Sequence, residues 1–264
     1  MRDVLEKVAK GQISVDDAER LLRVLAIQEV GNLAKLDVNR DFRKKMPEII
    51  LGEGKTPEDL TEITLRMLNE KRQAIVSRVN KQQIDAIKNA APENTISKVN
   101  DKIGMLVIKK KDLEVEKTGG KIGLLTAGTS DIPVAEEAKI LAEEMGCDVI
   151  SAYDVGVAGI HRLFPPLKQM IQEDVDAIVV VAGREGALPA VVAGLVDVPV
   201  IAVPTSVGYG LGEKGLSALT AMLQACPLGL AVVNIDGGVA AGAVAALIAN
   251  RVAEKESESR NSRR

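Results

Sequence analysis

The chain has 264 residues, a net charge of −3 and a hydrophobic fraction of 46%, to which aromatic residues contribute little, being 2% of the chain. A small negative charge gives no electrostatic attraction to DNA or to an anionic membrane, and so few aromatic rings leave almost nothing on which the bases of a single strand could stack. We therefore expect neither a nucleic-acid partner nor a membrane partner.

The charge is unevenly distributed along the chain. Residues 1–118 carry 23 Lys and Arg against 20 Asp and Glu, whereas residues 119–250 carry 6 against 14. This change, beside the pair Gly119 and Gly120, predicts an N-terminal domain over 1–118 and a catalytic domain over 119–250. The charged segment 251–264 is predicted to be a disordered tail.

Targeting and redox features indicate a cytoplasmic, soluble protein. The first residues are charged and hold no apolar signal core, and no apolar run is long enough to cross a bilayer. The two Cys residues lack metal-binding spacing, which fits a reducing compartment without a disulfide framework.

Two segments of residues 1–118 carry the pattern of a helix start. Ser14 precedes Asp17 by three positions, as in a capping box, and Thr56 precedes Pro57, which favours the first turn of a helix. Apolar residues follow at helical spacing, namely Leu21, Leu22 and Leu25, and then Leu60, Ile63, Met67 and Leu68. With one short strand-like stretch at 105–108, this region is predicted to be a smaller, mainly helical domain.

Cationic residues of this region allow two interpretations. Gly54-Lys55-Thr56 resembles the end of a phosphate-binding loop, but Ile49 stands where that motif needs Gly and we expect no strand before it, so a helix cap is favoured. Arg40 and Arg43 would share a helix face. They are either part of a solvated charged face or, with Lys55, supply cations that the acidic second domain lacks.

Apolar runs in the second domain alternate with helical patterns. The runs cover 121–126, 148–153, 177–181, 200–203 and 230–233, and the helical patterns cover 134–145, 160–173, 187–196, 214–225 and 238–250. Nearly continuous Val, Ile and Leu strands joined by helices are typical of a parallel sheet that is covered on both faces. We therefore predict a doubly wound α/β fold with a five-stranded parallel sheet.

Each of these five strands runs into a loop that holds Gly, Ser or Asp. The loops begin at Ala127, Asp154, Ala182, Pro204 and Asn234. In a parallel sheet all five lie at one edge, where open α/β folds bind their ligands. Because Gly allows close approach of the backbone and amides at helix starts favour anions, the pattern predicts a nucleotide-like ligand.

Several sequence blocks carry a resemblance to a known family. The second domain contains TAGTSDIPVAEEA, DVGVAGIHRL, VAGREGALPAVVAGL, VPVIAVPTSVGYG and VVNIDGG, and the N-terminal region contains LDVNRDFR and PEIILGEGKTPED. With these blocks the chain resembles the LarB family over nearly its whole length, the tail excepted. The second domain is also similar to PurE, an aminoimidazole ribonucleotide carboxylase. This similarity implies a parallel sheet of the PurE/flavodoxin-like type.

Two other functions stay open. PurE has a second His before its Leu-Pro pair, whereas this chain has His161 alone, with Gly186 and Ala187 before Leu188, and it has an N-terminal region that PurE lacks. The first alternative is therefore a PurE-type carboxylase or mutase that acts on aminoimidazole ribonucleotide. A non-catalytic nucleotide-binding module that uses the same loops is the second.

The LarB resemblance implies a carboxylase and hydrolase that acts on nicotinic acid adenine dinucleotide. It would add CO₂, taken up as CO₂ or bicarbonate, to the pyridinium ring and cleave the phosphoanhydride, giving pyridinium-3,5-biscarboxylic acid mononucleotide and AMP. This product begins the assembly of the nickel-pincer nucleotide. Because a pyridinium ring is electron-poor, a thiolate would first have to add to it and make one ring carbon nucleophilic.

The resemblance identifies Cys226 as that catalytic thiol, although a free Cys is more commonly a core residue. Cys147 is expected to be such a small buried residue. Cys226 ends a helix that leads away from the ligand edge, so it should lie at the opposite edge of its own sheet. We therefore expect a homo-oligomer whose active site is shared between subunits.

Three further residues are candidate acids or bases. Asp131 is the cap of the following helix, an active-site carboxylate, or both. His161 is either a structural residue or a general acid or base. Glu185 is either a surface residue or the base that removes the ring proton.

The remaining candidates would bind the substrate. Arg162 and Arg184 are the expected partners of phosphate or carboxylate groups. The others lie in the strand-end loops and are Gly128, Thr129, Ser130, Asp154, Gly183, Ser206, Asp236, Gly237 and Gly238. Cleavage of the anhydride leads us to expect Mg²⁺ as a cofactor, but no motif identifies its ligands.

Overall fold

The computed structural model describes residues 2–22, 28–30, 34–36, 44–100 and 103–261. It divides the chain into two compact units, Met1–Leu113 and Glu114–Arg264, so the division lies slightly before the expected boundary at 118. Arg40 and Arg43 lie outside the described residues. The two units are described separately.

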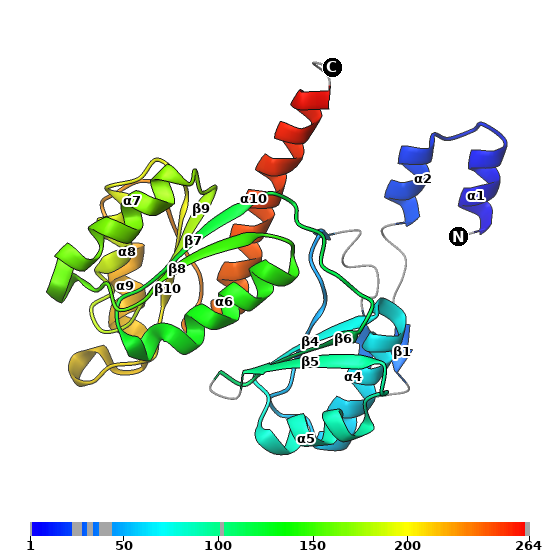
Figure 1. Ribbon diagram of the computed structural model, residues 1–264, viewed down its shortest axis with the longest axis horizontal. Coiled ribbons are helices and arrows are strands. Elements are labelled where there is room, and N and C mark those ends of the chain that lie inside the picture. Colours follow the sequence, from blue (N-terminus) through cyan, green and yellow to red (C-terminus); the bar gives the residue numbers. More distant parts are fainter. Residues whose placement is uncertain (1, 23–27, 31–33, 37–43, 101–102, 262–264) are drawn as a thin grey trace. The chain divides into compact units, whose positions relative to one another are not determined.

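The first unit contains a four-stranded sheet, of which the sequence predicted one strand. Its strands are β3 (Ile49–Leu51), β4 (Gln73–Ser77), β5 (Thr95–Asn100) and β6 (Met105–Lys110), in the order β3-β4-β6-β5. β3 and β4 are parallel, and β6 is antiparallel to both of its neighbours. Helices α4 (Pro57–Lys71) and α5 (Lys81–Ala90) pack together, and α4 covers the sheet (Figure 1).

The helix cap at Thr56 is confirmed. Its hydroxyl accepts a hydrogen bond from the backbone N–H of Asp59 (3.1 Å), and all four predicted apolar residues of α4 are buried. The backbone carbonyl of Lys55 accepts a hydrogen bond from the side chain of Gln83 (2.8 Å), which holds this turn in place. The expectation that no strand precedes this turn was wrong, because β3 ends at Leu51. Its three residues were too few to give a periodic signal.

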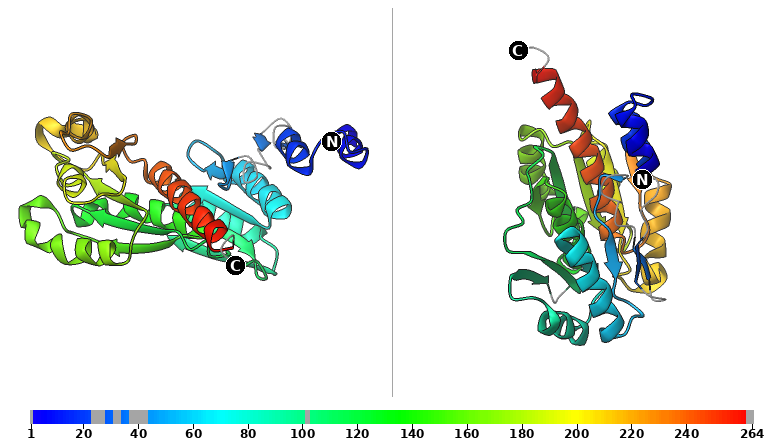
Figure 2. Two further views of the ribbon diagram at one scale, coloured as in Figure 1. Left: turned by 90° about the horizontal axis from the view of Figure 1, so that it is seen from above. Right: turned by 90° about the vertical axis from the view of Figure 1, so that its right-hand side faces the viewer.

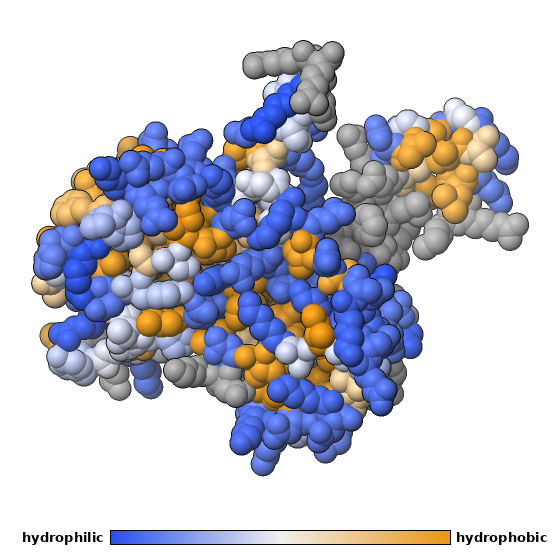
Figure 3. Space-filling view, in the orientation of Figure 1, coloured by the Kyte–Doolittle hydropathy of each residue, from blue (hydrophilic) through white to orange (hydrophobic). Residues whose placement is uncertain are grey.

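A pair of short helices begins the chain. α1 (Arg2–Ala9) contacts α2 (Val15–Leu22), and the side chain of Ser14 caps α2 by accepting a hydrogen bond from the N–H of Asp17 (3.0 Å). An antiparallel hairpin follows, made of β1 (Gln28–Val30) and β2 (Ala34–Leu36). Leu5 and Val15 are exposed, and Figure 3 shows apolar surface on this helix pair.

The second unit has the predicted five-stranded, all-parallel sheet. Its strands are β7 (Lys121–Thr126), β8 (Asp148–Ala152), β9 (Ala177–Ala182), β10 (Val200–Pro204) and β11 (Leu230–Val232). Their order is β11-β10-β9-β7-β8, so the chain starts in the interior of the sheet, adds one neighbour on one side and then continues on the other. This is the flavodoxin-like form of a doubly wound fold.

Helices cover both faces of this sheet (Figures 1 and 2). α6 (Ile132–Glu144) and α10 (Gly238–Asn261) pack on one face, whereas α7 (Phe164–Gln172), α8 (Leu188–Ala193) and α9 (Leu216–Leu223) contribute to the core on the other. The central strand β9 is buried along its whole length, as expected for a strand between two helical layers.

The C-terminal helix differs from the prediction. We expected a disordered tail from Arg251, but α10 continues to Asn261, and its last turns extend past the sheet (Figures 1 and 2). This stretch is rich in Glu, Lys and Arg, which favour helix, and Arg260 pairs with Glu256 one turn earlier (3.2 Å). Among the helices that the structure describes, α10 included, none is long and apolar enough to span a bilayer.

Candidate functional site

A cavity of about 270 Å³ lies at the carboxyl ends of the strands in the second unit. It lies where the chain direction across the sheet reverses, between β7 and its neighbours β8 and β9, which is the position at which ligands bind in doubly wound folds. Loops after four strands contribute to its lining, which includes Gly128, Ser130, Asp131, Asp154, Arg162, Gly183, Arg184, Glu185 and Val207. The structure thus brings eight of the predicted site residues together.

Asp131 is the most buried ionisable group of the cavity, with 4% of its surface exposed. One carboxylate oxygen accepts a hydrogen bond from the N–H of Gly128 (2.9 Å), and the other accepts one from the hydroxyl of Thr205 (2.7 Å). Burial raises the pKa of Asp131 above its ordinary value, although these hydrogen bonds oppose the rise. The side chain makes no hydrogen bond that caps α6, but its bond from Gly128 closes the start of the short 3-10 helix Thr129–Asp131 that leads into α6.

Thr205 was missed by the sequence analysis as a member of this site. It is fully buried, and its hydroxyl also lies close to Gly183, where an added Cβ would come within 2.6 Å of it. The loops after β7, β9 and β10 therefore meet around the carboxylate of Asp131. Its position directly after a strand is no specific signal for this contact, which depends on how the loops pack.

Two arginines give the cavity its positive charge. Arg162 ends a short 3-10 helix after β8 and pairs with Asp154, and both side chains stay partly exposed. Arg184 follows β9 and its backbone φ is +52°, while Asp154 has φ +58°. Non-glycine residues seldom adopt this left-handed conformation, and such local strain is concentrated at functional sites. The backbone of Arg184 is thus held in a restricted conformation, as is that of Asp154, the partner of Arg162.

The contact between Arg184 and Tyr209 was not predicted from the sequence. The Nη1 of Arg184 donates a hydrogen bond to the phenolic oxygen of Tyr209 (2.8 Å), and its guanidinium carbon lies 4.5 Å from the centre of the ring. The backbone N–H of Arg184 donates to the carbonyl of Val207 (3.3 Å). Two hydrogen bonds and a stacking contact thus join the loops after β9 and β10.

Several predicted site residues do not line this cavity. Thr129 and His161 are exposed beside it, and Ser206 donates its backbone N–H to Asp236 (2.8 Å) at the neighbouring strand ends. Gly237 lies at the start of α10. Gly238 follows it, and an added Cβ there would lie 2.1 Å from the carbonyl of Val134, so this Gly lets α10 pack closely on α6.

Cys226 lies between α9 and β11. Because the strands are parallel and Cys226 precedes β11, it lies at the amino edge of the sheet, opposite the cavity. Its thiol is exposed and free. The expected separation of Cys226 from the ligand edge of its own sheet is therefore present.

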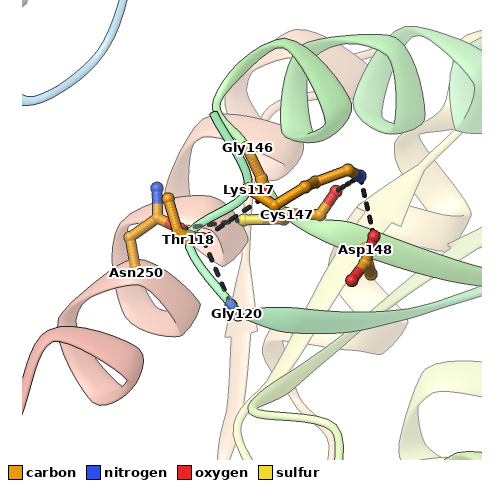
Figure 4. Close-up of polar contacts among 7 residues, drawn as sticks. All are labelled: Lys117, Thr118, Gly120, Gly146, Cys147, Asp148 and Asn250. Carbon is orange, nitrogen blue, oxygen red and sulfur yellow. Dashed lines mark hydrogen bonds and ion pairs between the residues drawn. The ribbon is translucent and has the colours of Figure 1, made fainter. Parts of the chain in front are cut away.

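Cys147 is buried within a network of polar contacts (Figure 4). Its thiol donates to the side-chain oxygen of Asn250 (3.2 Å), which also accepts from the hydroxyl of Thr118 (2.7 Å). Burial raises the pKa of Cys147 to about 11, so this thiol stays protonated near neutral pH. The predicted structural role is thus confirmed.

Among the described residues, protein side chains alone form no site for the expected Mg²⁺. In the part of the chain that the structure describes, no three Asp, Glu, His or Cys side chains gather as a metal site would require. Asp154, a carboxylate that lines the cavity, is already paired with Arg162. The donor set therefore does not fit a resident metal, and we derive no step through one.

Comparisons with known proteins agree with the two units. The family model of the LarB/PurE-like N-terminal domain matches residues 27–108, and that of AIR carboxylase matches residues 121–263. An uncharacterized protein of Methanocaldococcus jannaschii is 48% identical over 94% of this chain and 96% of its own length.

Two enzymes resemble this chain over about half of its length or less. The N5-carboxyaminoimidazole ribonucleotide mutases of Thermotoga maritima and Methanocaldococcus jannaschii are 30% and 33% identical to this chain, over 48% and 44% of it and over 74% and 71% of their own lengths. The AIR carboxylase match at residues 121–263 covers the five-stranded sheet and its cavity. The chain belongs to the LarB family and carries a PurE-like, carboxylase-type domain.

Proposed function

We propose that this protein carboxylates the pyridinium ring of nicotinic acid adenine dinucleotide and hydrolyses its phosphoanhydride, releasing pyridinium-3,5-biscarboxylic acid mononucleotide and AMP. The observation that carries the proposal is the pairing, in one chain, of a LarB-type N-terminal domain with a carboxylase-type domain. The cavity supports it, because Arg162 and Arg184 offer two cations to the phosphates and carboxylate of such a substrate.

The carboxylation begins with a thiolate. The sulfur of Cys226 forms a bond to a ring carbon, and the electron pair displaced through the ring makes another ring carbon nucleophilic. That carbon forms a bond to CO₂. A base then takes the proton from the same carbon, and the electrons released restore the aromatic ring as the carbon–sulfur bond breaks. The net change is replacement of a ring proton by a carboxylate, without an oxidant or reductant.

Asp131 is our choice for the base that takes the ring proton. It lines the cavity and is buried, and burial raises its pKa toward the range in which a carboxylate accepts protons efficiently near neutral pH. Glu185 also lines the cavity but is exposed, which leaves its carboxylate solvated. Glu185 is therefore the second candidate for this step.

Cys226 can serve this cavity only from another copy of the chain. In its own copy it stands at the amino edge of the sheet, whereas the cavity opens at the carboxyl edge. A homo-oligomer in which the amino edge of one copy faces the cavity of the next would supply the sulfur. A thiol nucleophile must stay reduced, which fits a cytoplasmic location.

The test uses labelled bicarbonate and mass spectrometry. The protein is incubated with nicotinic acid adenine dinucleotide and ¹³C-bicarbonate, and a mononucleotide that carries one labelled carboxylate is expected together with AMP. The Cys226→Ser variant should lose at least roughly a thousandfold in rate, as is usual when a nucleophile is removed. AMP release without a labelled product would reduce the activity to hydrolysis, and binding without turnover would favour a non-catalytic module.

The similarity to N5-carboxyaminoimidazole ribonucleotide mutases supports a second candidate. It is the weaker one because His161, the single His of the chain, does not line the cavity. Turnover of an aminoimidazole ribonucleotide, unaffected by Cys226→Ser, would favour this activity over the proposed one.

A further inference from the structure

We propose that the ring of Tyr209 is the platform on which the pyridinium ring stacks, and that Arg184 occupies this platform until the substrate arrives. The inference rests on the proposed function, because it identifies the residue that would recognise the reacting ring. It starts from the contact between Arg184 and Tyr209, in which the guanidinium carbon lies 4.5 Å from the ring centre.

Tyr209 is placed for contact with a ligand. Its side chain is 77% exposed, and its hydroxyl is tied to Arg184, which itself lines the cavity. Val207, two positions before it, also lines the cavity. Gly210 follows with φ +76°, and an added Cβ there would meet no atom within 4 Å. A large aromatic ring is thus held at the cavity by one arginine.

The group that now stacks on Tyr209, the guanidinium of Arg184, indicates which ligand group could stack there. A guanidinium group is a flat cation with delocalised charge, and it is attracted to the negative face of an aromatic ring. A pyridinium ring is also a flat, delocalised cation. The face of Tyr209 that accepts the guanidinium therefore suits the pyridinium.

An exchange of partners follows from the charges of the substrate. The phosphates and the ring carboxylate are anions, and they attract Arg184 more strongly than the phenol does. When Arg184 turns to one of these groups, the face of Tyr209 becomes free for the ring. Stacking would cover one face of the pyridinium and leave the other open to an attacking sulfur.

The scarcity of aromatic residues makes the test direct. The chain has two Tyr and no Trp, so its intrinsic fluorescence comes from Tyr153 and Tyr209 alone. In the Tyr153→Phe variant all emission comes from Tyr209. Titration with nicotinic acid mononucleotide is expected to quench this emission with saturation. The Tyr209→Phe variant, which emits from Tyr153 alone, is the matched control and should show no saturable quenching.

Affinity measurements extend the test. We expect Tyr209→Leu to weaken binding of nicotinic acid mononucleotide by about 5- to 30-fold, the range of a stacked cation, while Tyr209→Phe keeps most of the affinity because it keeps the ring. The chemically reduced mononucleotide, whose ring is uncharged, should bind wild type and Tyr209→Leu alike. Light scattering on each variant checks that the assembly is unchanged.

Three results would overturn the inference. If wild type and Tyr209→Leu bind nicotinic acid mononucleotide equally well, Tyr209 does not stack on the pyridinium ring. Saturable quenching by AMP but not by nicotinic acid mononucleotide would assign the ring to adenine. A loss of affinity that accompanies a changed assembly would make Tyr209 an interface residue. The turnover assay on wild-type protein distinguishes these results from failure of the proposed function. If the wild-type protein turns over the dinucleotide, the proposed function holds whichever result Tyr209 gives.

Discussion

The carboxylate of Asp131 accepts a hydrogen bond from the hydroxyl of Thr205, with 2.7 Å between the two oxygens, in the buried interior beside the cavity. The bond joins the loop after β7 to the end of β10, which are separated in the sheet by β9. A charged group in this position is stabilised by its hydrogen bonds and destabilised by its burial, and burial has the larger effect on its pKa.

The pKa of Asp131 predicts how stability depends on pH. A carboxyl whose pKa is raised in the folded state favours folding when it is protonated, and this contribution is lost as the pH rises through the raised value. We therefore expect Asp131→Asn, which cannot ionise, to have a higher melting temperature than wild type at neutral pH. The difference should close below about pH 4, where an ordinary aspartate is protonated as well.

Melting curves from pH 3.5 to 8 measure this difference, and Glu185→Gln, an exposed member of the same cavity, is the control. A difference that stays constant across this range would show that Asp131 titrates normally. Activity should fall by about 100-fold or more in Asp131→Asn, as expected for loss of a general base.

The two thiols should react very differently. Cys226 is exposed, whereas Cys147 is buried and its pKa is raised to about 11. Native wild-type protein is therefore expected to react with one equivalent of a thiol reagent at pH 8, and the Cys226→Ser variant with almost none. After denaturation, two thiols should react in the wild-type protein and one in the Cys226→Ser variant. Rapid labelling of native Cys226→Ser would contradict the burial of Cys147.

Close packing of α10 on α6 predicts sensitivity to added methyl groups. A Cβ at Gly238 would lie 2.1 Å from the carbonyl of Val134, and one at Gly242 would lie 2.4 Å from the carbonyl of Ala138. Each Gly→Ala change should lower the free energy of unfolding by about 1–3 kcal/mol, as overpacking commonly does.

The matched control is Gly194→Ala, whose added Cβ would meet its nearest atoms at 3.6 Å, an ordinary contact. Chemical denaturation compares the three variants, and equal stabilities would show that α10 can move away from α6 at little cost. A selective effect of Gly238→Ala on substrate affinity, with stability unchanged, would instead support the substrate-binding role predicted from the sequence.

Metal removal should leave the free protein unchanged. Because no metal-binding cluster is found among the described residues, treatment with EDTA is expected to leave the melting temperature as it was. Any Mg²⁺ requirement should arise only with a substrate that carries a pyrophosphate, whose oxygens supply most of the ligands. Calorimetry with and without the dinucleotide tests this, and tight Mg²⁺ binding to the free protein would contradict it.

The sheet of the second unit was predictable because its three inner strands, β7, β9 and β10, are buried. Each then reads as a run of Val, Ile and Leu, as Ala177–Ala182 does, and the intervening helices fix the parallel direction. In the sheet of the first unit, β5 was missed for the opposite reason. β5 is mostly exposed and holds Ser97 and Lys98, so no apolar run marks it.

The candidate site was predictable in its location but not in its contacts. Gly-rich strand ends indicated the loops around Asp131 and Arg184, because parallel topology brings all strand ends to one edge. The partners Thr205 and Tyr209 depend on how neighbouring loops pack, which no local pattern encodes. The packing role of Gly238 was not foreseen for a related reason, since Gly serves close helix packing as well as ligand binding.

The cavity at the reversal of strand order has a consequence for how such proteins diversify. Its walls are loops that enter and leave a rigid sheet, so each can change in length or composition without disturbing the buried strands. One scaffold can therefore acquire new substrates by remodelling its rim, while the interior evolves slowly under the separate constraint of packing.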